Sequence, residues 1–297
     1  RGAGQGAGVF RRSAIGRGQI MIDTHAHLHL PDFDHDRECV VIRDFALGLT
    51  GILEVSISAN RWSIVKLLAE GDRRILATAG VHPHEAARET APDLRALEKQ
   101  IHHSSVVAIG ETGIDTYRDY APLEDQRKLF AAQVRLARES GLPLVIHCRE
   151  AFQEVFSILD REGRGEVRGV FHCFSGDLTA ARQVLARGFA VGLGGAVTYA
   201  PERWRPLLRS LPLESLLLET DCPYLRPAPD RGGRNEPALV FHTAQVVAEL
   251  LGIDPGELER IADRNAAELF GFSVTARDQG AGVPGGQHAD RFRDSGA

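Results

Sequence analysis

The sequence predicts a single α/β domain folded as a (β/α)₈ barrel, or TIM barrel. Eight short aliphatic or β-branched runs alternate with longer amphipathic segments. The runs recur about every 28 residues, which is close to the length of one strand–helix unit, and eight such units fit in about 250 residues. The runs begin near Ile22, Gly51, Ile75, Val106, Leu144, Gly169, Phe189 and Leu216.

The runs have the composition of strands that are buried on both faces. Leu144-Val145-Ile146, for example, is apolar throughout, as a parallel sheet covered by helices requires. An open, doubly wound sheet is the alternative arrangement of the same units. The first run, however, is followed by DTHAHLHL and not by a GxGxxG dinucleotide fingerprint. The barrel is therefore favoured.

The segments between the runs carry helix start and stop signals. Asp177 is a predicted N-cap, and so is Asn60, which precedes a segment that stops at Gly71. A longer helix is predicted from Glu124 to Gly141, where glycine favours termination. These signals place helices where the barrel needs them.

We expect the domain to span residues 21–272. Residues 1–20 are rich in Gly and Arg and precede Met21; we expect a disordered extension, vector-derived or upstream of the true start. A transit peptide or a twin-arginine signal at Arg11-Arg12 is the alternative, but no apolar stretch follows the arginines. Residues 273–297 have too few apolar side chains to offset their ordering entropy, so we expect a disordered tail.

Composition excludes several classes of protein. The net charge is −5, and the predicted domain is more acidic still because the first 20 residues are basic. A broad basic surface for duplex DNA is thus excluded, and any nucleic-acid contact must be local. Four cysteines without a CxxC pair make no disulfide framework, so a cytoplasmic location is expected. No apolar run approaches the ~18 residues of a membrane span, and no membrane contact is expected.

Residues of metal-ligand type follow five of the eight runs directly. In a barrel of this kind the chemistry lies at the carboxyl ends of the strands, so these side chains should meet at one rim. His25 and His27 are two apart and therefore point to the same face of an extended strand. The set consists of His25, His27, Glu111, His147, His172 and Asp221.

This set predicts a binuclear metal centre. Mixed imidazole and carboxylate ligands suit zinc, manganese, iron, cobalt or nickel, whereas magnesium prefers oxygen ligands. Six ligands exceed the three or four that one catalytic zinc ion uses, so two divalent ions are expected. Glu111 can offer one oxygen to each ion and is the predicted bridge. The metal, whether zinc, manganese or magnesium, is left open.

The scarcity of lysine excludes other chemistries. Only three of the 35 basic residues are lysines, Lys66, Lys99 and Lys128, and all fall in helix-like segments. A carbamylated lysine that bridges two metals, a Schiff-base aldolase and a P-loop kinase each need a lysine elsewhere.

Eight motifs resemble those of one family. They are IDTHAHLHLPDFDHD, GVHPHEA, AIGETGID, PLVIHCREA, FHCFSGD, ETDCPYLRP, RGGRNEP and RNAAELFG. In this order, from about Met21 to Phe270, they are similar to the TatD family of metal-dependent deoxyribonucleases. The resemblance implies a (β/α)₈ hydrolase that cleaves phosphodiester bonds of DNA, often as a 3′→5′ exonuclease on single strands.

Position by position, the resemblance carries over the same six ligands. It motivates a mechanism in which metal-activated hydroxide attacks phosphorus in line and Asp221 orients or deprotonates the water, with Glu111 as the second catalytic residue. Two positions depart from the family pattern. His29 stands where a carboxylate is frequent, and Thr116 stands where an aromatic residue is common, with Tyr117 one place later.

Substrate contacts are predicted around this centre. His82 and Arg149 follow strand ends and are expected to touch phosphate, with a rim salt bridge as the alternative. Arg226, Arg231 and Arg234 lie in the Pro- and Gly-rich loop after the eighth strand, where such barrels often hold phosphate. Tyr117 and Tyr224 are expected to stack on bases, or else to pack in the core.

The four cysteines are not predicted to bind metal, and two alternative functions remain open. Cys148, Cys173 and Cys222 each follow a predicted ligand and are read as small buried hydrophobes, and Cys39 as helix core. An amidohydrolase-type C–N or ester hydrolase, such as an aminoacyl-tRNA deacylase, is the alternative enzyme. From a different class, a non-catalytic metal- or nucleic-acid-binding subunit that retains the barrel is a further alternative, and the presence of all six ligands argues against it. The expected partner is DNA, with RNA left open, and the default oligomeric state is a monomer.

Overall fold

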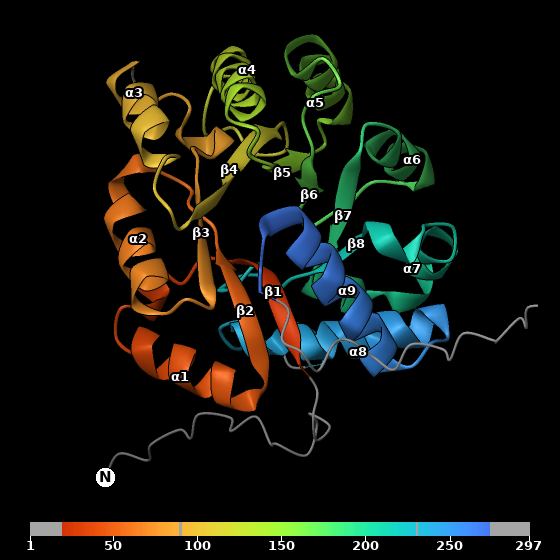
Figure 1. The fold of residues 1–297 in the computed structure, drawn as a ribbon. Helices are drawn as coiled ribbons and strands as arrows, with labels where there is room; N and C mark the ends of the chain where they lie inside the picture. The colour runs from red at the N-terminus through yellow and green to blue at the C-terminus, as the bar shows by residue number, and fades with distance from the viewer. Residues whose placement is uncertain (1–19, 89–90, 230, 274–297) are drawn as a thin grey trace, which may run out of the picture.

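A computed structural model describes residues 20–88, 91–229 and 231–273. Eight parallel strands form one sheet in the order β1 to β8 (Figure 1). Each begins within two residues of a predicted run, so the predicted fold class is confirmed. The strands are β1 (Met21–Ala26), β2 (Leu49–Glu54), β3 (Ile75–Ala79), β4 (Val106–Asp115), β5 (Leu144–Arg149), β6 (Gly169–Phe171), β7 (Phe189–Leu193) and β8 (Leu216–Leu218).

The sheet closes into a barrel where β8 meets β1. A parallel bridge joins Ala26 to Cys222, and the backbone N–H of His27 donates to the carbonyl of Cys222 at 2.9 Å. Further along, the hydroxyl of Thr24 donates to the carbonyl of Leu218 at 3.0 Å. These bonds connect the two ends of the sheet.

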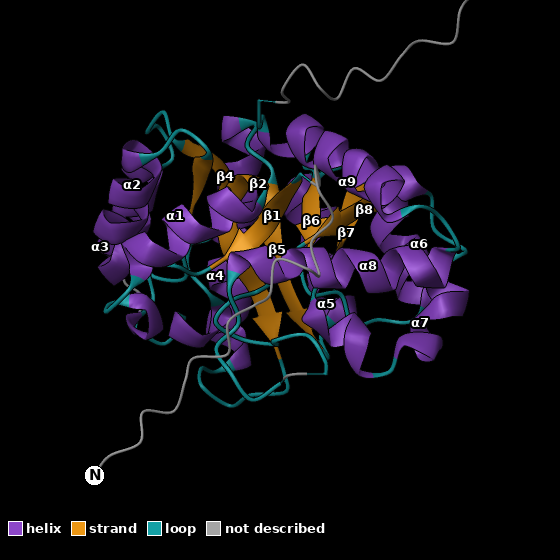
Figure 2. Cartoon of the chain, turned by 90° about the horizontal axis from the view of Figure 1, so that it is seen from below, coloured by secondary structure: helices purple, strands orange, loops and turns teal. Residues whose placement is uncertain are grey.

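Helices surround the strands, and the strand arrowheads point to one end of the barrel, where loops gather (Figure 2). The outer position of the helices explains the uninterrupted apolar character of the strands, which are covered from both sides. The helices are α1 (Arg37–Leu47), α2 (Trp62–Gly71), α3 (Ala91–Gln100), α4 (Leu123–Ser140), α5 (Phe152–Ile158), α6 (Leu178–Ala186), α7 (Pro201–Leu208), α8 (Val240–Leu251) and α9 (Pro255–Phe270).

The helix-capping predictions hold in two cases and fail in one. Asp177 caps α6 by accepting the backbone N–H of Ala180 at 2.8 Å, and α4 ends at Gly141 in the left-handed conformation with φ 73°. Asn60, however, does not cap α2. It lies inside a 3₁₀ turn, Ala59–Arg61, and the helix begins only at Trp62. The helix therefore begins without a side-chain cap, because the 3₁₀ turn runs directly into it.

The amino end of the barrel is closed by the last helix. α9 lies across the strands in Figure 1. Its residue Asp263 accepts the backbone N–H of Ile22 at 2.7 Å. Phe270 and Phe272 join Val145 and other barrel side chains in one buried apolar cluster. Since this end is filled by hydrophobic packing, polar chemistry is confined to the opposite, carboxyl end.

The predicted termini are not tested by the structure, and the predictions for the cysteines are only partly confirmed. The predicted extension 1–20 and tail 273–297 lie outside the described residues, except for Ile20 and Ser273.

Of the cysteines, Cys148 and Cys222 are buried as predicted, but Cys173 is only partly buried. Cys39 is exposed, so its assignment to the helix core is wrong. The neighbouring Val40 carries the inward face of α1 instead. Within the described residues, no helix is long and apolar enough to cross a membrane.

The close approach of β3 to β4 generates a test of packing. A Cβ placed on Gly80, directly after β3, would lie 2.4–2.6 Å from backbone atoms of Gly110. We expect Gly80→Ala to lower the free energy of unfolding by about 2–3 kcal/mol, because backbone cannot yield as a side chain does. Gly71→Ala is the matched control, since nothing lies within 4 Å of its Cβ; it should be neutral or slightly stabilising. Urea denaturation of both variants measures this, and equal stabilities would contradict the packing argument.

Candidate metal centre

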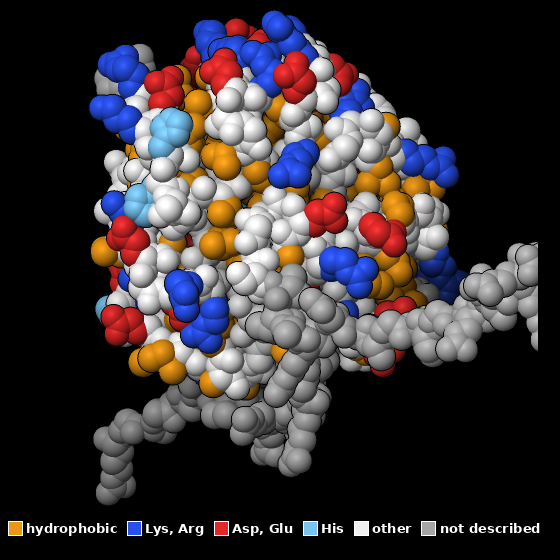
Figure 3. Space-filling model, viewed as in Figure 1, with side chains coloured by type: hydrophobic (Ala, Val, Ile, Leu, Met, Phe, Trp, Pro, Cys, Tyr) orange, Lys and Arg blue, Asp and Glu red, His pale blue; other side chains and the backbone are white. Residues whose placement is uncertain are grey.

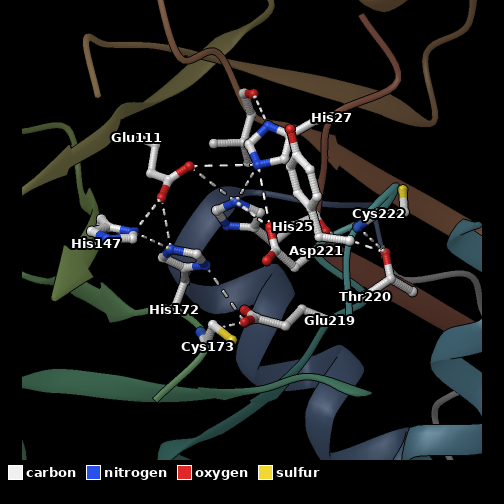
Figure 4. A network of polar contacts seen from close by, with 12 residues as sticks. His25, His27, Glu111, His147, His172, Cys173, Glu219, Thr220, Asp221 and Cys222 are labelled. Carbon is white, nitrogen blue, oxygen red and sulfur yellow. Dashed lines mark hydrogen bonds and ion pairs between the residues drawn. The ribbon is translucent and has the colours of Figure 1, made fainter. Parts of the chain in front are cut away.

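The six side chains predicted from the sequence lie together at the carboxyl end of the barrel (Figure 4). β1 supplies His25, and His27 follows it; β4 supplies Glu111 and β5 supplies His147. His172 and Asp221 follow β6 and β8. Parallel strands that end at one rim bring together residues almost two hundred positions apart in the chain.

Glycine permits β4 and β5 to come close enough for this arrangement. A Cβ on Gly113 would lie only 1.9 Å from the carbonyl oxygen of His147, and its φ of +146° is one that other residues rarely adopt. Two residues before it, Glu111 is 3% exposed, and its carboxylate lies between two pairs of imidazoles (Figure 4). The GETG sequence thus places a carboxylate between close-packed strands.

Glu111 uses its two oxygens on two different groups. Oε1 lies 2.7 Å from Nε2 of His172 and 3.0 Å from Nδ1 of His147. Oε2 lies 3.5 Å from Nε2 of both His25 and His27. This division is the geometry of a carboxylate shared by two sites.

Asp221 completes the group on the Oε2 side. Its Oδ1 lies 3.3 Å from Nε2 of His27 and 3.7 Å from Nε2 of His25, and the two imidazole nitrogens are 3.1 Å apart. Ligands about 2.0–2.2 Å from a tetrahedral ion lie roughly 3.3–3.6 Å from one another. The spacing of these donors therefore fits a cation held among them.

The charges of the cluster also fit cations. Burial alone would lower the pKa of His27 and His147, but nearby carboxylates raise both pKa values to about 9: Asp221 and Glu111 beside His27, Asp115 and Glu111 beside His147. Protons on these imidazoles balance the buried negative charge. Divalent ions would displace such protons and balance the same charge, as metal binding generally does.

Buried polar atoms behind the cluster give a second indication. Nδ1 of His25, Nδ1 of His172 and Oε2 of Glu219 have no hydrogen-bond partner among the described residues. The two rings are stacked, with centroids 4.0 Å apart, and Oε1 of Glu219 lies 3.7 Å from Nδ1 of His172. Burial raises the pKa of Glu219 to about 7. A neutral imidazole that binds a cation through Nε2 carries its proton on Nδ1, which in His172 is the nitrogen that faces Glu219.

The predicted phosphate contacts lie beside this cluster. Nε2 of His82 is 3.4 Å from Oε1 of Glu111, and burial lowers the pKa of His82 to about 4. The guanidinium of Arg149 lies at the end of β5 and stacks on the ring of Tyr117, 3.9 Å from its centroid. Tyr117 is 51% exposed and is not core packing.

The arginines after β8 divide into different environments. Arg234 makes ion pairs with Asp36 at 2.7 Å and Glu236 at 2.8 Å. Arg226 donates to the carbonyl of Arg234 at 2.5 Å, within the loop itself. Arg231 lies over the ring of Tyr199, 3.7 Å from its centroid.

Tyr224, from the same loop, faces the centre. Its ring centroid lies 6.4 Å from that of His27, and its side chain is 53% exposed. The interpretation of Tyr224 as core packing therefore does not hold. The ring is available to a ligand that reaches His27.

His29, which stands where the family frequently has a carboxylate, is paired with the carboxylate of Glu54. Nδ1 of His29 lies 2.6 Å from Oε1 of Glu54, and both side chains are fully buried. Glu54 also accepts the backbone N–H groups of Leu28 and His29. At Thr116, the hydroxyl donates to the carbonyl of Glu150 at 2.7 Å and joins the loops after β4 and β5.

Sequence reasoning overlooked Asp115 and His84, which lie next to His147. Oδ2 of Asp115 is 2.9 Å from Nε2 of His84 and 3.1 Å from Nε2 of His147. Burial opposes ionisation of Asp115, but hydrogen bonds from His147, Arg118 and His84 hold its pKa below the usual range. The available signal was its position, two residues past Gly113 at the end of the same strand.

Comparison with known proteins agrees with this site. The model of the family described as TatD related DNase matches residues 22–271. The chain is 37% identical to the uncharacterized metal-dependent hydrolase YabD of Bacillus subtilis, covering 84% of this chain and 99% of that protein. It is 38% identical to the 3′-5′ ssDNA/RNA exonuclease TatD of Cronobacter sakazakii, covering 84% and 97%.

A solved structure is similar as well. YJJV, a TATD homologue from Escherichia coli K12, superposes with a TM-score of 0.80 at 31% identity, covering 84% of this chain and 98% of that one. The barrel, the spacing of the motifs and these relatives agree over almost all of the described residues, and the chain belongs to the family of TatD-related DNases.

Proposed function

We propose that this protein is a divalent-metal-dependent phosphodiesterase that removes nucleotides from the 3′ end of single-stranded DNA, with RNA as a second substrate. The observation that carries the proposal is the division of Glu111 between two groups of donors. One group is His25, His27 and Asp221, and the other is His147 and His172. The names of relatives such as the Cronobacter exonuclease support the choice of substrate.

Two divalent ions, zinc, manganese or magnesium, would be held by these two groups with Glu111 between them. When bound, such ions supply Lewis acidity toward a phosphoryl oxygen and toward the attacking water. The side chains of the protein would orient the water and accept its proton. Asp221 is the carboxylate that an entering water reaches, because its side chain is 12% exposed whereas Glu111 is 3% exposed. We assign Asp221 to orienting that water and accepting its proton.

The substrate is held at the rim around the cluster. We assign Arg149 to binding a phosphate through two N–H groups of its guanidinium, which stacks on the ring of Tyr117. Tyr117, Tyr120 and Tyr224 are exposed by 51–62%, and all three lie in loops after strands. Exposed aromatic rings beside arginines suit the bases and phosphates of a single strand. His82, Arg226 and Arg231 are proposed as further contacts.

Charge on the face opposite the site is consistent with such local binding. Figure 3 shows the face on which α9 lies, and there Lys and Arg are interspersed with Asp and Glu. A non-specific duplex binder would need a continuous basic surface. The four cysteines are unpaired, and we propose a reducing compartment, the cytoplasm, as the location.

The amidohydrolase-type alternative is less well supported. Lys66, Lys99 and Lys128 lie on α2, α3 and α4, so none stands at a strand end to bridge metals as a carbamate. The curated relatives described above include a named nuclease and a metal-dependent hydrolase. We therefore retain phosphodiester cleavage as the proposed activity.

Asp221→Asn tests the role of the exposed carboxylate. We expect turnover of a 5′-labelled single-stranded oligonucleotide to fall by about 10²–10⁴-fold, because Asn cannot accept the proton. Bound metal, measured by mass spectrometry, should be largely retained. Asp254→Asn is the control, since Asn caps the start of α9 as well as Asp does. A fully metallated and fully active Asp221 variant would end the assignment.

Glu111→Gln tests whether one carboxylate serves two ions. An amide offers a single acceptor oxygen, so we expect the protein to retain fewer divalent ions after dialysis than the native protein does, and to lose activity with them. Native protein treated with EDTA should lose activity and regain it when metal is restored. Two firmly bound ions in the Gln variant would contradict the bridging role.

Arg149→Ala tests the phosphate contact. Loss of one contact should raise KM about 10-fold and reduce the salt dependence of single-strand binding by about 0.7 in log–log slope. Arg73→Ala is the control, because Arg73 is exposed just before β3 at the opposite end of the barrel. If KM and slope stay at native values, Arg149 does not touch phosphate.

A further inference from the structure

We propose that Asp115 is a positioning residue that fixes the tautomer of His147 and so directs Nδ1 of that ring into the metal centre. The proposal rests on the metal centre proposed above and deepens it, because it concerns how one ligand is prepared. Asp115 does not itself face the space between the two donor groups. It lies behind His147, on the far side of the ring from Glu111.

Asp115 is held by donors on all sides. Its side chain is fully buried, and Oδ1 accepts the backbone N–H groups of Tyr117 at 2.8 Å and Arg118 at 2.9 Å. Oδ2 lies 2.9 Å from Nε2 of His84 and 3.1 Å from Nε2 of His147. An ionised carboxylate only accepts hydrogen bonds. Both imidazoles must therefore present an N–H at Nε2.

This hydrogen bond determines which nitrogen of His147 can bind a cation. A neutral imidazole with its proton on Nε2 has its lone pair on Nδ1. Nδ1 of His147 lies 3.0 Å from Oε1 of Glu111 and 3.4 Å from Nε2 of His172, so the lone pair points into the centre. Asp115 thus acts on the centre only through His147.

His27 shows the same principle with the opposite nitrogen. Its Nδ1 lies 2.7 Å from the carbonyl oxygen of Val55, an acceptor that requires a proton on Nδ1. The lone pair is then on Nε2, which faces Glu111 and Asp221. His27 and His147 therefore approach the centre through different nitrogens, each selected by the acceptor behind its ring.

A different interpretation of the same atoms is a further cation site. His82, His84 and His147 each offer a ligand atom within 4.8 Å of the others. This site would need Nε2 of His147 as a ligand while Nδ1 serves the centre, and a neutral imidazole has only one free lone pair. The two oxygens of Asp115 are also already used by four donors. We therefore favour positioning, and the test below separates the two.

The experiment uses the full chain loaded with zinc, with ¹⁵N-labelled histidine. The ring signals of His147 are identified by their absence in His147→Gln. In native protein we expect a proton on Nε2 and the shift of a metal-bound nitrogen on Nδ1. The reverse pattern in native protein would overturn the proposal, and this measurement does not depend on any variant of Asp115 folding.

Asp115→Asn then tests the cause. Asn can still accept from Tyr117 and Arg118 through its oxygen, but it turns an N–H toward Nε2 of His147 and so favours the wrong tautomer. We expect zinc affinity, measured by competition with a chelator, to fall by about 10–100-fold at the weaker site, with loss of the Nε2–H signal. Asp177→Asn, which also removes a charge from a carboxylate that accepts a backbone N–H, should change neither.

Three further outcomes would contradict the proposal. Unchanged zinc affinity and an unchanged His147 signal in Asp115→Asn would overturn the positioning role alone. Loss of a third zinc ion with an unchanged His147 signal would replace it with a separate cation site. Native protein that binds no zinc, manganese or magnesium would overturn the proposed metal centre itself, and with it this inference.

Discussion

The structure of the site depends on a buried carboxylate surrounded by imidazoles. Glu111 is 3% exposed, and a charge so far from water is tolerated only where it is paired. The His residues from β1, β5 and the end of β6 supply that pairing, and each group takes one oxygen. Remove the carboxylate and the imidazoles would repel cations and one another; remove the imidazoles and the carboxylate would be unpaired in the interior.

The barrel can hold this buried carboxylate because one of its ends is apolar and the other is polar. At the amino end, α9 and the apolar cluster that includes Phe270 fill the interior. At the carboxyl end the same strands finish in polar residues, and the closure of β8 against β1 brings Asp221 beside His27. The donors lie on the strands or within three residues of their ends, while the loops that follow carry the exposed aromatic and basic side chains. This arrangement separates the candidate metal ligands from the side chains proposed to contact the substrate.

Acceptors behind the imidazoles form a further layer of organisation. Val55 contributes a backbone oxygen to His27, and Asp115 contributes a carboxylate to His147. Glu219 lies behind His172 in the same way, at the longer distance of 3.7 Å. Each acceptor comes from the end of a strand or the residue that follows it. The fold therefore supplies the supporting residues from the same positions as the predicted ligands.

The barrel and the candidate ligands could be predicted from the sequence alone. Strand positions follow from apolar runs, whose pattern is local, and polar residues at their ends are visible without coordinates. Helix starts were less secure, as Asn60 shows, because a 3₁₀ turn and a capped helix begin with similar residues. Three features needed coordinates: Cys39 faces solvent, Arg234 forms an ion pair with Asp36, and Glu111 divides its oxygens between two groups. Asp115 became visible only when its distance to His147 was known, because hydrogen bonds between strands depend on register and side-chain direction, which no pattern within one segment contains.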